Sequence, residues 1–165
     1  MNDKEIGVKK IIQSFTSKWR FILFSLWKLP MAFLARLRVT RLNLKNAHVT
    51  VPYNYWNKNP FNSMYFAIQA MAAELSTGAL FFLHTDGKNI SILVTSLNSK
   101  YYKKAIGKIN FICLDGDKIA FSVNQAIDIG EAQECTVKSK GYDINGVCVS
   151  EFDITWSLKK RKSLM

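Results

Sequence analysis

The longest apolar stretch of the chain runs from Phe61 to Thr77 and contains no glycine or proline. Its apolar side chains lie on every side of a helical wheel, which is typical of a helix buried inside a domain. Gly78 follows directly and predicts the C-terminal end of the helix. Asn62 is the expected N-cap, with Asn59 in the preceding turn. We therefore predict a buried helix over residues 61–77.

Strand-like patterns surround this helix. Before it, HVTVPY alternates polar and apolar residues and leads into the Asn- and Pro-rich turn YNYWNKNP. After it, we expect strands in ALFFLH, NISILVTSLNSKYY, KINFICLDG, ECTVKSKGY and GVCVSEFDITWSLKK, with DING as a hairpin turn between the last two. The stretch DKIAFSVNQAIDIGEA is ambiguous, and a short helix is one interpretation. The predicted class is α+β, with four to five antiparallel strands curved around a long central helix.

The N-terminal segment predicts a helix over residues 7–29 that ends at Pro30, followed by a short helix in MAFLARLR. Its uncharged core, FILFSLW, is bracketed by Arg20 and Lys28 and is far shorter than the roughly 20 residues that span a bilayer. Two interpretations stay open: an interfacial helix on anionic lipid, or a helix packed on the domain or on a second subunit. We divide the chain into a helical extension (1–40), a domain (41–160) and a basic tail (159–165).

The charge distribution narrows the choice of partners. The net charge is +11, and residues 1–45 carry ten Lys and Arg against two acids. Such a field favours an anionic partner, although a basic surface can also serve solubility alone. Proteins that bind nucleic acid usually combine a basic patch with a known motif, and we recognise none, so we do not expect nucleic acid as a partner.

Cysteine and histidine usage indicates the compartment and disfavours a metal site. Cys113, Cys135 and Cys148 have no CxxC spacing and indicate free thiols in a reducing compartment, so we expect a cytoplasmic protein. Only His48 and His84 are present, neither at metal-ligand spacing, and we expect no metal.

Glu74 is the one acidic residue between Glu5 and Asp86, an interval with ten Lys and Arg. On the helical wheel it shares a stripe with Ala67, Ala70 and Met71, mostly small residues that leave space for a ligand. Burying an unpaired carboxylate costs several kcal/mol or raises its pKa, and either suits a general base or nucleophile in a dry pocket. A structural acid bonded to the backbone or to an arginine is the alternative.

The spacing around Glu74 resembles a known motif. Asn59 lies six residues before Tyr65, and Glu74 nine residues after it. This resembles the helix-opening motif of hotdog-fold thioesterases of the phenylacetic-acid-degradation type, in which His-Gly-Gly stands where this chain has Tyr65, Phe66 and Ala67. The pattern looks closer still to a poorly characterised branch that has Met-Tyr there, keeps the Glu and begins with an apolar helix. The similarity covers roughly residues 30–158.

The resemblance implies a hotdog fold that forms homodimers or homotetramers, with active sites at subunit interfaces. Its substrate would be an acyl thioester of coenzyme A or acyl carrier protein, with no separate cofactor. The apolar faces of the helix suggest a medium or long acyl chain. By carry-over, Glu74 would be the general base or nucleophile, the Phe66 N–H would polarise the thioester carbonyl, and Asn59 would position substrate or water.

The helical phase around Glu74 and the resemblance together suggest which residues contact the substrate. Tyr65, Ala67, Ala70 and Met71 would line the acyl pocket, while Lys103 and Lys104 would meet the phosphates of coenzyme A. Lysines that guard an exposed strand edge are the alternative for the last two. The alternative function is a non-catalytic binder of acyl groups or acyl-CoA, with peripheral contact at the inner membrane surface through residues 1–29.

Overall fold

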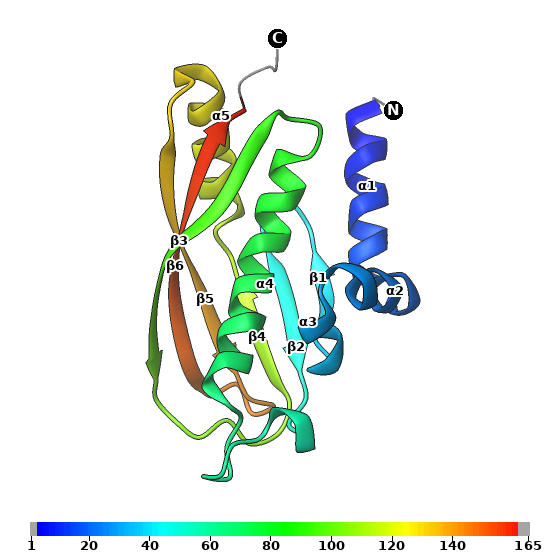
Figure 1. The fold of residues 1–165 in the computed structure, drawn as a ribbon, viewed down its shortest axis with the longest axis vertical. Coiled ribbons are helices and arrows are strands. Elements are labelled where there is room, and N and C mark those ends of the chain that lie inside the picture. The colour runs from blue at the N-terminus through cyan, green and yellow to red at the C-terminus, as the bar shows by residue number, and fades with distance from the viewer. Residues whose placement is uncertain (1–2, 162–165) are drawn as a thin grey trace.

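The computed structural model describes residues 3–161, with side chains from residue 6 onward. A single antiparallel sheet curves around the long helix α4 (Phe66–Thr85), and three short helices precede the first strand (Figure 1). The strand order is β1-β2-β4-β5-β6-β3, which leaves β1 and β3 as edges. The strands are β1 (Arg38–Leu42), β2 (Ala47–Val51), β3 (Ile90–Tyr101), β4 (Ile109–Cys113), β5 (Gln133–Tyr142) and β6 (Cys148–Lys160).

The predicted central helix exists but is shifted along the chain. It begins at Phe66, because residues 59–64 form a loop in which the Asn59 side chain accepts hydrogen bonds from the N–H groups of Phe61 (3.0 Å) and Ser63 (3.2 Å). Asn62 lies in this loop with a positive φ of 56°, so its assignment as N-cap was wrong.

The C-terminal end of α4 was also predicted too early. The helix continues through Gly78 to Thr85, and the strand expected in ALFFLH is its last part. Gly78 does not end the helix because it packs against Trp156, 3.3 Å from where its Cβ would lie. Tertiary packing therefore overrides the local signal. By length and composition α4 could cross a membrane, yet most of it is buried inside this domain.

The other strands follow the predictions, with additions. The DING stretch is the turn between β5 and β6, where the Asp143 side chain accepts hydrogen bonds from the N–H groups of Asn145 and Val147 (both 2.9 Å). The ambiguous stretch holds α5 (Gly116–Ile129), longer than expected. β1 was missed, because its short RVTRL pattern adjoins the predicted helix MAFLARLR. The sheet consequently has six strands.

The N-terminal extension forms three helices where one long and one short helix were predicted. They are α1 (Asp3–Thr16), α2 (Lys18–Lys28) and α3 (Pro30–Leu34), and the chain bends at the extended residue Ser17. The bend brings the Phe15 ring within 6.0 Å of Phe21 and within 5.4 Å of Phe82 on α4, measured between ring centroids. The bend allows Phe15 and Phe21 to be buried together, which accounts for the break between α1 and α2. Of the predicted basic tail, residues 162–165 lie outside the described residues.

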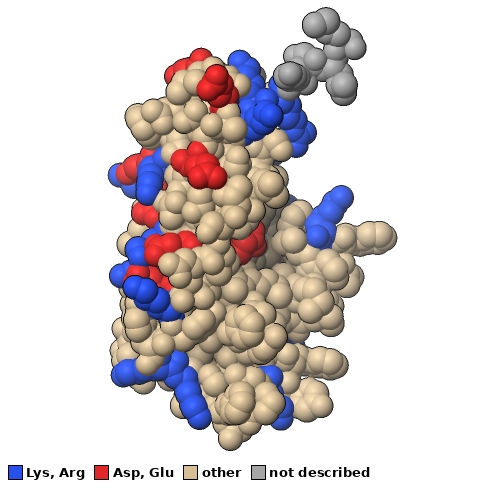
Figure 2. All heavy atoms as spheres, turned by 60° about the vertical axis from the view of Figure 1, so that its left-hand side comes forward, with Lys and Arg blue, Asp and Glu red and all other residues tan. Residues whose placement is uncertain are grey.

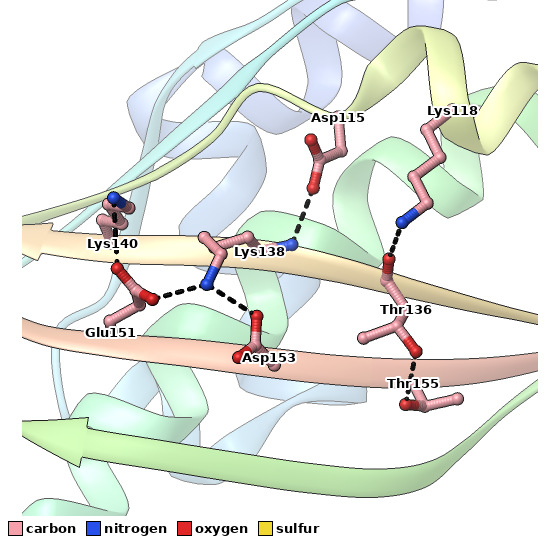
Figure 3. Close-up of polar contacts among 8 residues, drawn as sticks. All are labelled: Asp115, Lys118, Thr136, Lys138, Lys140, Glu151, Asp153 and Thr155. Atoms are coloured by element: carbon pink, nitrogen blue, oxygen red, sulfur yellow. Dashed lines mark hydrogen bonds and ion pairs between the residues drawn. The ribbon is translucent and has the colours of Figure 1, made fainter.

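The outer face of the sheet carries paired charges (Figure 3). Lys138 of β5 bonds Glu151 and also Asp153 (2.8 Å) of β6, and Lys140 lies 3.1 Å from Glu151. Hydrogen bonds from Lys138 and Lys140 lower the pKa of Glu151, and the bond from Lys138 has the larger effect. In Figure 2 charged side chains gather toward the margins and ends of the visible face, whose centre is mainly uncharged.

Candidate active site

Glu74 lies on the side of α4 that the sheet does not cover. The residues at positions 67, 70, 71, 74 and 78 are half-buried, whereas the opposite side of the helix is fully buried against the sheet. The Glu74 side chain lines a cavity of about 290 Å³, together with Met71 and Leu75 of α4. The opposite wall is the junction of α2 and α3, residues 28–32. The N-terminal extension therefore completes the pocket of Glu74.

The Glu74 carboxylate has no hydrogen-bond or ion-pair partner among the described residues. Its neighbours are mostly apolar side chains and Gly78, whose Cβ would lie 3.2 Å from Oε1; Lys28 also lines the cavity but forms no ion pair with Glu74. Desolvation in these surroundings raises the pKa of Glu74. Among the described residues no backbone group and no arginine side chain bonds this carboxylate. An unpaired carboxylate in an apolar cavity is instead suited to proton transfer.

A second cavity, of about 330 Å³, lies at the N-terminus of α4 and gathers several predicted site residues. Asn59, Phe66, Lys103 and Lys104 all line it, together with Ser63, Met64, Gln69, Tyr101 and Tyr102. The N–H groups of Phe66 and Ala67 belong to the first turn of the helix, where no intrahelical acceptor exists. They find no other acceptor in the described chain. This end of the helix can accordingly receive a ligand oxygen.

The polar side chains of this cavity differ in how many hydrogen bonds they already make within the protein. The Asn59 side-chain oxygen already accepts two backbone hydrogen bonds within its loop, so its amide nitrogen is the group left for a ligand. Lys104 donates from Nζ to the Phe61 carbonyl (3.0 Å) and is partly engaged. Lys103 is exposed, with no side-chain partner in the described part of the chain.

Gln69 is a site residue that the sequence analysis missed. Its side chain is only 3% exposed, and its Nε2 donates a long hydrogen bond (3.4 Å) to the Met64 carbonyl. Its Oε1 is buried without a hydrogen-bond partner among the described residues, and the residue lines the cavity. Buried polar atoms are rarely unsatisfied, so Oε1 is a candidate ligand acceptor. In the sequence, the feature that could have identified Gln69 is that it is a single amide side chain about one turn after the start of α4.

A buried asparagine anchors the loop that carries the start of α4. Asn57 is fully buried, and its Nδ2 donates to the carbonyls of Ala35 (2.9 Å) and Pro52 (2.8 Å). The Asn57 carbonyl in turn accepts the N–H of Tyr65 at 2.8 Å. The side chain of Asn57 thus connects the end of α3 with the end of β2, and its main-chain carbonyl adds the beginning of α4.

The remaining predicted substrate residues lie around these cavities. Met71 lines the Glu74 cavity, whereas Ala67 and Ala70 lie between the two cavities and line neither. The Tyr65 side chain is exposed and contacts the Phe66 ring edge-on at 4.8 Å, also outside both cavities. Within the small-residue stripe, the space beside Gly78 is filled by Trp156, whose Nε1 donates to Thr77 Oγ1 (3.1 Å).

One chain keeps the two parts of the predicted site apart. Phe66 and Glu74 are eight positions apart on one helix, about 12 Å along the axis at 1.5 Å per residue. A single thioester carbonyl cannot lie within hydrogen-bond distance of both. One chain therefore does not bring both groups within hydrogen-bond distance of the same atom.

Comparison with known proteins agrees with this fold. The family model described as a domain of unknown function, DUF4442, matches residues 17–158. The chain belongs to the DUF4442 family. No curated protein matches it.

Solved structures similar to this DUF4442 chain include several proteins described as thioesterases. A Pseudomonas aeruginosa protein of unknown function, PA5026, described as a probable thioesterase, has a TM-score of 0.76 and 22% identity, covering 90% of this chain and 99% of its own. Thioesterase HI1161 of Haemophilus influenzae has a TM-score of 0.62 and 11% identity, covering 87% of this chain and 92% of its own. A mutant of thioesterase PA1618 of P. aeruginosa has a TM-score of 0.67 and 12% identity, covering 84% of this chain and 92% of its own. The predicted hotdog fold is confirmed.

Proposed function

We propose that this DUF4442 protein hydrolyses acyl thioesters and that Glu74 is its general base. The observation that carries the proposal is the Glu74 carboxylate, half-buried in an apolar cavity without a polar partner and with a raised pKa. A carboxylate in such a place takes up a proton more readily than one in water, as a base in hydrolysis must. The likeness to hotdog thioesterases supports the reaction class.

In the proposed reaction Glu74 removes a proton from a water molecule as the water oxygen attacks the thioester carbonyl carbon. The carbonyl oxygen gains negative charge and accepts hydrogen bonds from the N–H of Phe66 at the N-terminus of α4. The C–S bond then breaks, and the thiolate takes the proton held by Glu74, which leaves a carboxylic acid and a thiol. Direct attack by the carboxylate, through an acyl-Glu74 anhydride that water hydrolyses, uses the same groups.

We further propose that a second copy supplies the missing half of each site. β3 is a twelve-residue edge strand with exposed apolar side chains at Leu93, Leu97 and Tyr101, and two such edges can pair into one continuous sheet. This pairing would bring the α4 start of one copy towards Glu74 of the other. Lys103 and Lys104, just beyond β3, would then meet the phosphates of coenzyme A or of a carrier protein.

One observation favours a second candidate function, a non-catalytic acyl binder. Phe66 stands where the resembling thioesterases have a glycine, and its exposed side chain stands beside the N–H groups that the carbonyl must reach. In this alternative the same cavities hold an acyl thioester without cleaving it.

Thiol release from a panel of acyl-CoA esters distinguishes the two functions. We expect hydrolysis by the wild type and a loss of roughly 10²-fold or more in kcat for Glu74→Gln, because general-base catalysis contributes about 10²–10⁴-fold. Glu131→Gln, an exposed carboxylate on the loop after α5, is the matched control and should keep full activity. Hydrolysis that survives Glu74→Gln would remove Glu74 from the mechanism, and saturable acyl-CoA binding without thiol release would establish the binder.

A further inference from the structure

The α2–α3 segment presents an unusually exposed apolar ridge. We use the term elbow ridge for Trp19, Leu23, Leu26, Trp27, Met31 and Leu34. Trp27 is 83% and Trp19 70% exposed, and within α2 only Phe21 and Ser25 are buried. At 100° per residue the four α2 members occupy one face, opposite the buried Phe21 and Ser25. The helix thus packs on the domain by one side and offers a second apolar side to its surroundings.

The charges around the elbow ridge are all positive. Arg20 lies next to Trp27 on the helical wheel, at the edge of the apolar face, whereas Lys18 and Lys28 lie at the two ends of α2 on its other side. No acidic residue occurs in the sequence between Glu5 and Glu74. Tryptophans with flanking lysines and arginines are the side chains that settle at the boundary between lipid headgroups and acyl chains.

This charge pattern disfavours a second copy of the chain as the occupant. A symmetric contact through the elbow ridge would bring Arg20, at the edge of the ridge, close to the same residue of the partner, and α2 itself carries no acidic residue to compensate. In Figure 1 the three helices lie on the opposite side of the domain from the β3 edge, so pairing through β3 leaves the ridge open. An anionic bilayer satisfies both the apolar and the basic side chains.

The elbow ridge is also continuous with the pocket of Glu74. Lys28, Leu29 and Met31 are exposed, and all three line the Glu74 cavity. An acyl chain that leaves a lipid surface at the elbow ridge would therefore meet the wall of the Glu74 cavity, which Lys28, Leu29 and Met31 form.

We propose that the elbow ridge binds an anionic membrane surface and that the Glu74 cavity receives its acyl substrate from that surface. The second half of this inference rests on the proposed thioesterase function, whereas membrane binding does not. The substrate class that follows is a long-chain acyl thioester, which partitions into the bilayer through its hydrocarbon chain.

Sedimentation with vesicles tests the binding without reference to catalysis. We expect the full chain to sediment with vesicles of phosphatidylcholine and phosphatidylglycerol and much less with phosphatidylcholine alone. Trp19→Ser/Trp27→Ser and Arg20→Glu/Lys28→Glu should each weaken binding to the anionic vesicles by roughly tenfold or more. Matched controls elsewhere are Phe121→Ser/Ile144→Ser and Lys108→Glu/Lys159→Glu, all at exposed positions, and these should bind as the wild type does.

Three outcomes would overturn the proposal. Equal sedimentation of ridge and control variants would show that the ridge is not the contact. Absence of vesicle binding, combined with a smaller oligomer for Trp19→Ser/Trp27→Ser in sedimentation velocity, would assign the ridge to a second copy. Tight binding of soluble acyl carrier protein that the ridge variants abolish, without any vesicle binding, would assign it to a carrier. None of these depends on thiol release, so failure of the thioesterase proposal is separately visible.

Discussion

The Glu74 carboxylate is half-buried, lacks a polar partner and faces an apolar cavity. Its isolation in a basic sequence and its place among small residues were visible without a structure. The α2–α3 wall of its cavity was not, because nothing in the local pattern of residues 28–32 says which part of the domain they pack against. Gln69 was missed for a related reason, since a helical pattern does not reveal whether an amide finds its partners.

The raised pKa of Glu74 predicts a pH-dependent cost to stability. Below about pH 4 the carboxyl is protonated in both the folded and unfolded chain, so Glu74→Gln should unfold like the wild type. As pH rises from the unfolded pKa through the raised folded pKa, the wild type should lose stability relative to Glu74→Gln. The difference amounts to about 1.4 kcal/mol per unit of pKa difference.

Denaturant unfolding between pH 4 and pH 8 measures this difference, with Glu131→Gln as control. A Glu74→Gln variant that is less stable than the wild type at pH 8 would mean that the carboxylate has a stabilising partner, contrary to the structure.

The unsatisfied Oε1 of Gln69 predicts a role in positioning substrate. Gln69→Leu has a similar volume and removes the acceptor, so kcat/KM should fall about 2–10-fold, as expected for one lost hydrogen bond, while folding stability stays nearly unchanged. Gln125→Leu on α5, away from both cavities, is the matched control. Unchanged kcat/KM in Gln69→Leu would limit Gln69 to a structural role.

At the scale of elements, the Asn57 anchor sets where α4 begins. Asn57→Ala should lower the free energy of unfolding by about 2–4 kcal/mol, because the carbonyls of Ala35 and Pro52 lose their donor and a cavity remains. Asn145 in the β5–β6 turn is exposed, so Asn145→Ala should change the free energy of unfolding by less than about 0.5 kcal/mol. Chemical denaturation compares the two, and equal midpoints would show that Asn57 is not an anchor.

Element types were more predictable than element boundaries. Alternation correctly predicted β2 and the β5–β6 hairpin, because a half-buried sheet imposes a period of two. Helix ends were predicted wrongly at Gly78 and at Ser17, because they depend on tertiary contacts. Trp156 packs against Gly78, where the helix continues, and the contacts of Phe15 accompany the bend at Ser17.

At the scale of the whole molecule, sequence periodicity predicted the α+β class, and the motif around Glu74 predicted the hotdog fold. The predicted helix already placed Phe66 and Glu74 eight residues apart, and the structure keeps both on α4. That separation follows from the rise per residue of one helix, and it makes assembly part of the proposed chemistry.

Assembly through β3 predicts that Leu97→Arg weakens self-association. The side chain is exposed on the edge strand, so the fold should tolerate the change while like charges oppose pairing of two edges. Sedimentation velocity should show a smaller species with lower activity. Leu114→Arg, an exposed leucine outside β3, is the control. An unchanged mass for Leu97→Arg would exclude this interface.

The most direct test of the central claim is thiol release by mixed oligomers of two inactive chains. Phe66→Pro removes the N–H at the first position of α4, where proline fits, and Phe66→Ala retains that N–H as its control. We predict that Glu74→Gln and Phe66→Pro are each inactive alone and that co-expressed, differently tagged copies recover thiol release, because one site per pair then has both groups intact. Purified mixed oligomers that stay inactive beside an active wild type would contradict a site shared between two chains.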